Sequence, residues 1–314
     1  MRAPRLLSLP WLAATASLLS LALGPAAALT AEDLPAATSW YFHADFDEMR
    51  DSPAGRDLVG WIEQEVFAEI REETGVDLSE ELDRLTAYST DGAGAVMVMD
   101  GRFSRQTRDK ALAAAAMAHR FETLKSAGKT YYHVVGDGEH RGDNIEISGI
   151  DNEFFFSFDV PGKLVLAAQK AQIEEMLANG GKVTGARSHD GALFVLTAER
   201  ALVQAGMNTD SFDGDDDGGF DSNILRNTRQ LAVMIADMAG NIAIEARLHA
   251  TEPEMAESLA SIVRGLIALQ AFSEDMDPEL SRFLQGTRVD VDGEQLSISV
   301  ALAPGDLRAM LDEA

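Results

Sequence analysis

Pairs of short alternating segments joined by tight turns are the feature that most constrains the fold of this 314-residue chain. The pairs lie at residues 85–89 with 95–100, 230–237 with 242–250, and 288–291 with 295–301, and each turn contains glycine. Alternation with period two is typical of a half-buried strand. A short link joins antiparallel neighbours, because parallel strands need a long crossover. The sequence therefore predicts an α+β fold of antiparallel β-hairpins packed under helices, rather than a doubly wound parallel sheet.

Stretches with helical spacing separate these hairpins. Every fourth residue of 54–70 is apolar and Ser52 precedes the run as an N-cap, which predicts a helix with one buried stripe. A second helix is predicted over 104–126, where an alanine-rich segment suits close packing on a sheet. Thr251 and Glu254 have the spacing of a capping box and predict the start of a long helix. Further strands are predicted at 40–46, 130–135, 144–150, 153–158, 163–168 and 192–198, with a short helix at 170–178.

The order of elements is repeated along the chain. Strand, helix, hairpin, helix and hairpin follow one another in the first half and again from residue 192. Residues 85–112 align with 231–259, since both contain a strand, a glycine turn, a second strand and a helix start. This favours two duplicated β-β-α-β-type lobes, at 29–190 and 191–314, each with a sheet beneath its helices. A chance match between two α+β segments is the alternative, because identity between them is low.

A motif near the start of the first predicted lobe is similar to one in known proteins. His43-Ala44-Asp45 lies on a predicted strand, ahead of a Met-x-x-x-Pro-Ala-Gly-Arg helix start that runs from Met49 to Arg56. The pattern resembles that of uncharacterised secreted bacterial α+β proteins of unknown function, mainly over residues 39–110. The resemblance supports the fold class, and it implies no activity because none is established for those families.

The N-terminal segment has the features of a secretory signal. Arg2 and Arg5 form a positive start, residues 6–23 are mostly apolar, and an alanine triplet at 26–28 provides a cleavage site. The sequence therefore predicts a signal peptide over 1–28 and a periplasmic or secreted protein. An uncleaved anchor is the alternative, because the apolar run is about long enough to span a bilayer. After cleavage, no later segment is predicted to span a membrane.

The chain is strongly acidic, with 52 Asp and Glu against 26 Lys and Arg and a net charge of −26. Such a charge repels a phosphate backbone, so nucleic acid is excluded as a partner. It favours a cationic ligand or a basic protein as partner; solubility in an ion-rich compartment or adaptation to salt is the other explanation. Cysteine is absent, which excludes disulfides, thiolate metal sites and thiol nucleophiles.

An acidic, glycine-rich loop at 209–221 carries the most specific ligand motif. Its aspartates alternate as in the opening of a calcium loop, and carboxylates at alternate positions can converge on one hard cation. Position twelve departs from the motif, because the bidentate Glu expected there is Ile224. Calcium is the only cofactor that the sequence predicts, and a solvated acidic linker is the alternative. The predicted metal ligands are Asp213, Asp215, Asp217 and Asp221.

Two other groups of residues are candidates for a site. His43, Asp45 and Asp47 alternate along a predicted strand, so three potential metal ligands could share one face; a half-solvated strand has the same pattern. The phenylalanines at 154–156 and 158 indicate either a strand buried on both faces or a wall that lines a ligand site. The remaining histidines are interpreted as surface or satisfied core residues: His119, His133, His140, His189 and His249.

These observations favour an exported acidic protein that acts as a binding or interaction module. The sequence has no nucleophile elbow, phosphate-binding loop or dinucleotide-binding loop, so no catalytic constellation is visible. A periplasmic hydrolase whose site is assembled from distant carboxylates is one alternative, and a calcium-stabilised structural module is another. The ligand is predicted to be a protein or a small molecule that binds between the two lobes or on an exposed sheet face.

Overall fold

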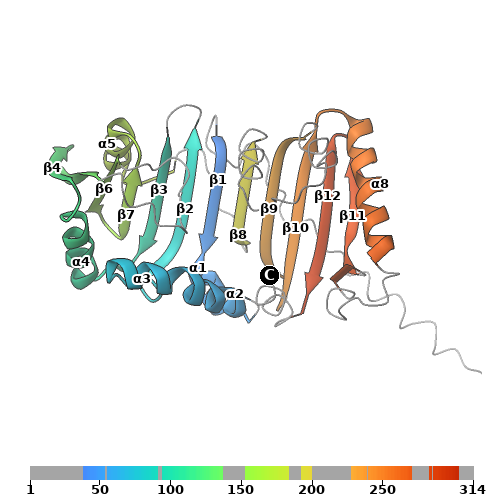
Figure 1. Ribbon diagram of the computed structural model, residues 1–314, viewed down its shortest axis with the longest axis horizontal. Coiled ribbons are helices and arrows are strands. Elements are labelled where there is room, and N and C mark those ends of the chain that lie inside the picture. Colours follow the sequence, from blue (N-terminus) through green and yellow to red (C-terminus); the bar gives the residue numbers. More distant parts are fainter. Residues whose placement is uncertain are drawn as a thin grey trace, which may run out of the picture.

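A computed structural model of the protein describes residues 38–53, 55–90, 94–136, 153–183, 192–199, 228–238, 240–270, 283–284 and 286–303. Within these ranges the chain forms one 12-stranded sheet with helices beside it (Figure 1). Every pair of neighbouring strands is antiparallel. The strand order is β11-β12-β10-β9-β8-β1-β2-β3-β7-β6-β5-β4. The predicted α+β class with antiparallel pairing is therefore confirmed.

The elements have the following bounds. The strands are β1 Thr38–Asp45, β2 Leu82–Thr90, β3 Ala95–Gly101, β4 Arg120–Ser126, β5 Lys129–Val135, β6 Glu153–Val160, β7 Lys163–Ala167, β8 Ala192–Glu199, β9 Thr228–Met238, β10 Asn241–Ala250, β11 Arg288–Asp292 and β12 Gln295–Leu302. The helices are α1 Phe46–Asp51, α2 Gly55–Ile62, the π-helix η2 Glu63–Phe67, α3 Ala68–Thr74, α4 Arg105–Ala115, α5 Lys170–Asn179 and α8 Pro253–Gln270.

The sheet consists of two halves that join between β1 and β8. We call strands β1 to β7 the N-terminal half-sheet and strands β8 to β12 the C-terminal half-sheet. At the junction, His43 lies opposite Val195. The sequence predicts a separate sheet in each lobe, whereas the structure has one continuous sheet. Pairing of β1 with β8 removes two edges that would otherwise expose unpaired backbone groups.

The two half-sheets follow the same strand path. Strands β1, β2 and β3 are successive neighbours and β7 lies beside β3, just as β8, β9 and β10 are successive neighbours and β12 lies beside β10. Helix α4 follows β3, and α8 follows β10. The aligned segments 85–112 and 231–259 therefore occupy corresponding positions. Among the described strands, the N-terminal half-sheet has an additional hairpin, β4–β5, ahead of its β6–β7 hairpin.

Helices cover both faces of the N-terminal half-sheet. Phe42 and Ala44 belong to the largest core, in which α1 to α4 pack on one face, while Tyr41 points to the other face because side chains alternate along a strand. Helix α5 covers that other face, where Ile173 and Leu177 are fully buried against β3, β6 and β7. Packing on both faces restricts the movement of these strands, and therefore of the side chains at their ends.

Helix α8 packs on the C-terminal half-sheet. Its Leu259 and Ala260 are buried against Leu296 of β12. Leu296 and Val300 point to the same face, and Val300 belongs to the largest core. Helix α8 therefore lies on the same face of the sheet as α1 to α3. Of the helices in the described ranges, none is long and apolar enough to cross a bilayer.

The second predicted helix is much shorter than expected. It ends at Ala115, and residues 120–126, which were predicted to be helical, form strand β4. Ala127 and Gly128 both have positive φ, at 52° and 77°, so Gly128 belongs to the two-residue turn of a hairpin rather than to a helix end. Cross-strand pairing with β5 overrides the local helical preference.

A short helix that was not predicted, α1, precedes the first predicted helix. Its N-cap is Asp45, whose side chain accepts a hydrogen bond from the Glu48 backbone N–H at 3.0 Å. Ser52 then caps the next helix as predicted, because its Oγ accepts from the Gly55 N–H at 2.8 Å. Ser52 also donates to Asp237 of β9 and so links the two half-sheets. Gly55 is required here, because a Cβ at this position would lie 2.6 Å from Met49 Cα.

Candidate binding site

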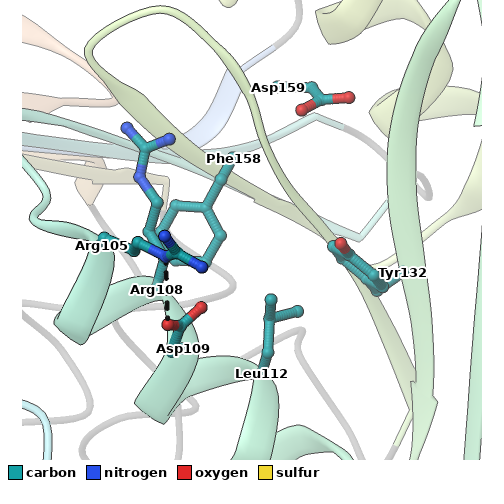
Figure 2. Close-up of a pocket in the computed structure, with 7 residues that line it drawn as sticks. All are labelled: Arg105, Arg108, Asp109, Leu112, Tyr132, Phe158 and Asp159. Atoms are coloured by element: carbon teal, nitrogen blue, oxygen red, sulfur yellow. Dashed lines mark ion pairs between the residues drawn. The ribbon is translucent and has the colours of Figure 1, made fainter.

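A pocket of about 430 Å³ lies between helix α4 and strands β5 and β6. Figure 2 shows the seven side chains that line it. Four come from one face of α4, one from β5 and two from the end of β6. The volume is in the range of small-molecule sites. The lining residues are Arg105, Arg108, Asp109, Leu112, Tyr132, Phe158 and Asp159.

The start of α4 is fixed in place, and this sets the position of its pocket residues. Ser104 caps the helix by accepting the Thr107 N–H at 3.1 Å, and its own N–H donates to Glu81 at 2.9 Å. Residues three, four and seven positions apart share a helix face. The helix therefore presents four side chains to the strands on one face: Arg105, Arg108, Asp109 and Leu112.

Arg108 is the most unusual group in the pocket. Its guanidinium carbon lies 5.7 Å from the centroid of the Phe158 ring, which is a cation–π distance. Its Nε is buried, and no residue in the described ranges accepts a hydrogen bond from it. Leaving a buried donor without an acceptor costs about 1–3 kcal/mol, and more for a charged group. The aromatic ring holds the cation in place, and no residue in the described ranges forms an ion pair with it.

Arg105 and Asp109 form an ion pair that a ligand could readily replace. Their Nε and Oδ2 atoms are 3.6 Å apart, and the side chains are 94% and 67% exposed (Figure 2). An exposed pair of this kind contributes about 1 kcal/mol or less. Asp159 is held more firmly, since its carboxylate accepts the Thr130 N–H at 2.5 Å and its own N–H donates to Ser157 Oγ at 3.0 Å.

Aromatic side chains form the wall of the pocket opposite the solvent. Tyr132 stacks on Phe121, with ring centroids 5.4 Å apart and an interplanar angle of 9°, and it lies 5.1 Å from Phe156. Phe158 is 8% exposed and packs edge-on against Phe156. Because these rings support one another, the wall is rigid.

The predicted aromatic strand is buried on both faces, which confirms one of the two interpretations of the phenylalanine run. Phe154, Phe156 and Phe158 pack in the largest core, and Phe155 packs on the opposite face with the α5 cluster. In addition, Phe158 lines the pocket. One residue of the predicted aromatic strand thus belongs to the pocket wall, although the pocket lies within the N-terminal half-sheet and not between lobes.

The alternating His43, Asp45 and Asp47 do not form a shared face. Strand β1 ends at Asp45, and Asp47 lies in the first turn of α1. Asp45 caps that helix and pairs with Arg84 at 2.8 Å, while His43 Nδ1 lies 2.9 Å from Thr86 Oγ1. The three side chains therefore do not form the candidate metal site, because capping of α1 turns the chain out of the strand after Asp45.

The histidines in the described ranges have partners, as the sequence interpretation expects. His133 lies 2.8 Å from Glu153 and 3.4 Å from Glu122, and its ring stacks on Phe155 at 4.5 Å. His249 lies 3.8 Å from Glu294. His119, predicted on the long helix, lies between α4 and β4 and also has a partner. His140 and His189 lie outside the described residues.

The predicted calcium ligands Asp213, Asp215, Asp217 and Asp221 lie outside the described residues, as do the signal segment 1–28 and the predicted strand 144–150. Within the described ranges, no group of three His, Asp or Glu side chains is placed to hold a metal ion. Calcium binding by the loop at 209–221 therefore stays a prediction.

Sequence reasoning missed the arginines of the pocket, although the sequence contains a signal for them. Arg105 and Arg108 lie in the first turns of a helix that has no acidic residue there. The positive end of the helix dipole disfavours cations at this position. Two arginines at this position therefore mark the start of α4 as a candidate site for an anion. Tyr132 and Asp159 carry no such signal, because their position beside α4 depends on the pairing of β5 with β6.

Comparison with known proteins does not assign the chain to a family. No protein-family model matches the chain, and no curated protein matches it. Six chains of solved structures do match, among them crystal forms of TP0453. Crystal form I is 9% identical with a TM-score of 0.46, and the match covers 91% of this chain and 98% of that one. For crystal form III the identity is 8%, the TM-score is 0.46 and the coverage is 92% and 100%.

Proposed function

We propose that the protein is an exported binding protein and that the pocket between α4, β5 and β6 binds a small organic acid. The observation that carries this proposal is Arg108, which lines the pocket with its guanidinium held over Phe158 and forms no ion pair within the described ranges. A ligand carboxylate can pair with the terminal nitrogens of this guanidinium. Charge-assisted hydrogen bonds between arginine and carboxylate are about twice as strong as neutral ones.

The surroundings of Arg108 support an acid with an apolar body. Arg105 adds a second guanidinium, and the start of α4 contributes the positive end of a helix dipole. Leu112, Tyr132 and Phe158 provide apolar surface beside these cations. The net charge of −26 predicts cationic partners at long range, but that field is screened within about 10 Å at ordinary ionic strength. Close to α4, the two arginines govern which ligand binds.

Binding is favoured over catalysis by the residue types in the pocket. None of the seven lining residues is a serine, threonine, histidine or lysine. Asp109 and Asp159 are the specific support for the alternative, a hydrolase built from distant carboxylates. Both are exposed, whereas a carboxylic acid that donates a proton near neutral pH is usually kept in an apolar site. A substrate panel in which turnover depends on either aspartate would favour the hydrolase.

The acid-binding pocket is tested by matched arginine variants. Calorimetry with a series of aryl and alkyl carboxylates is expected to give saturable binding to the wild-type protein. Arg108→Met keeps the side-chain stem over Phe158 but removes the donors, so it should weaken binding at least about tenfold. Arg288→Met on the distant edge strand β11 makes the same change in net charge and should leave binding unchanged. Equal affinity in both variants would overturn the proposal.

We also propose that the two half-sheets are duplicated lobes and that the chain is exported after cleavage of residues 1–28. The shared strand path and the matching positions of 85–112 and 231–259 support duplication. The charged start, the apolar run and the alanine triplet support export. N-terminal sequencing of the exported protein should begin near Leu29, and retention of Met1 in a membrane fraction would contradict cleavage.

A further inference from the structure

Two charged groups of opposite sign are left without an ionic partner in the pocket. Arg105 and Asp109 pair with each other at 3.6 Å. Within the described ranges, neither Arg108 nor Asp159 forms an ion pair: Arg108 lies over Phe158, and Asp159 accepts only a backbone N–H. The pocket thus presents one unpaired cation from α4 and one unpaired anion from β6.

Arg108 and Asp159 lie apart in the same pocket, near its apolar side chains. Figure 2 shows the two arginines together beside Phe158, with Asp159 apart from them on the side of β6. Phe158, Leu112 and Tyr132 provide the apolar surface near them. The carboxylate of Asp159 is held in position through Thr130, so it is a fixed acceptor rather than a freely rotating surface group.

We infer that the pocket binds a zwitterion, namely an amino acid with an apolar or aromatic side chain. Its carboxylate pairs with Arg108, its ammonium group pairs with Asp159, and its side chain packs on Phe158, Leu112 and Tyr132. This inference rests on the proposed function and deepens it, since it adds a required ammonium group to the required carboxylate. A second carboxylate on the ligand would meet Asp159 and be repelled.

The charge balance of the whole chain is consistent with such a ligand. A zwitterion carries no net charge, so the field of a chain with net charge −26 neither attracts nor repels it at long range. Recognition then depends on the two short-range contacts, which are strong only when both are made at once. Binding should therefore depend little on ionic strength compared with the binding of a simple anion.

Three matched probes separate the two contacts. L-phenylalanine has both charged groups, 3-phenylpropanoate lacks the ammonium group, and 2-phenylethylamine lacks the carboxylate. Calorimetry should show phenylalanine binding at least about tenfold more tightly than either of the other two, because each loses one charge-assisted contact. Arg108→Met should weaken both carboxylate probes.

The variant Asp159→Asn tests the contact between Asp159 and the ammonium group of the ligand. An asparagine oxygen still accepts the Thr130 N–H, so the fold should be kept, which a thermal unfolding curve checks. The variant should bind phenylalanine about tenfold more weakly and bind 3-phenylpropanoate at least as well as before. Asp290→Asn, an exposed aspartate on β11, is the matched control and should change neither affinity.

The possible failures are distinguishable. If 3-phenylpropanoate binds the wild-type protein as tightly as phenylalanine and the binding still needs Arg108, the zwitterion inference is wrong and the acid-binding function stands. If no carboxylate probe binds, both are wrong. Preferential binding of 2-phenylethylamine that is insensitive to Arg108→Met would likewise overturn both.

Discussion

The two half-sheets have the same strand path, but they differ in the helices that cover them and in one additional hairpin. In the N-terminal half-sheet, α1 to α4 pack on one face and α5 packs on the other. In the C-terminal half-sheet, the described helix α8 packs on a single face. The N-terminal half-sheet also has the hairpin β4–β5, which has no counterpart among the described strands of the other half.

This difference explains where the pocket lies. Tyr132 belongs to the additional hairpin, and Phe158 and Asp159 belong to the strand that pairs with it. Helix α4, which corresponds in chain order to α8, supplies the remaining lining residues. The pocket is therefore built where one half-sheet departs from the common path, and α5 packs on the opposite face of the strands that form its wall.

Truncation of one leucine in each half of the molecule, one fully buried and one partly buried, tests the difference in packing. Leu177 of α5 is fully buried, whereas Leu248 of β10 is only partly buried. Leu177→Ala should lower the free energy of unfolding by about 2–5 kcal/mol, and Leu248→Ala by about 1–2 kcal/mol, because less surface is re-exposed. Urea denaturation of both variants measures this. Equal losses would show that the C-terminal half-sheet is packed as tightly as the other.

A row of alternating charges crosses the N-terminal half-sheet, and its disruption is expected to cause the next largest loss in the free energy of unfolding. Asp45, Arg84, Asp100 and Lys163 lie opposite one another on β1, β2, β3 and β7. Asp45 and, more weakly, Asp100 raise the pKa of Arg84. The side chains of Asp100 and Lys163, which pair with each other, are 31% and 21% exposed.

Asp100→Asn should therefore lower the free energy of unfolding by about 1–2 kcal/mol, since it leaves both cations of the row short of a partner. Glu294→Gln is the comparison in the C-terminal half-sheet, where Glu294 pairs with the 53% exposed Arg229. That loss should stay below about 1 kcal/mol. Thermal or urea unfolding measures both, and a larger loss for Glu294→Gln would reverse the comparison.

The sequence predicts those parts of the fold that depend on local patterns. Hairpins such as residues 85–100 were predictable because alternation and glycine turns are local signals, and helix α5 was predictable from its spacing. The strand at 120–126 was not, because its alternation is weak and an alanine-rich helix precedes it. Only the partner strand β5 distinguishes the two outcomes.

The site was less predictable than the fold, because it depends on contacts distant in the sequence. Phe158 belonged to a recognised cluster, and its burial on a strand follows from its neighbours. Arg108 is 50 positions away from Phe158, and the pairing of the two requires the path through β4 and β5. The alternation of His43 with Asp45 and Asp47 suggested a candidate metal site that does not form, because periodicity does not show where a cap ends a strand.

The smallest expected effect concerns the anchor of α4. Burial raises the pKa of Glu81, but hydrogen bonds from the Ser104 backbone and from the hydroxyl groups of Ser104 and Thr107 outweigh it, so the pKa lies below its ordinary value of 4.5. A carboxyl whose pKa is lowered by folding contributes stability above its unfolded pKa and loses it as the pH falls through the folded pKa. In Glu81→Gln, the free energy of unfolding should fall less steeply than in the wild type as the pH drops below about 4.5. Glu257→Gln, which changes an exposed residue of α8, is the control and should keep the wild-type slope. Urea unfolding at a series of pH values measures the slopes. The same slope in all three proteins would show that Glu81 does not anchor the helix that carries Arg105 and Arg108. The aromatic wall would then be the part of the pocket that holds its shape.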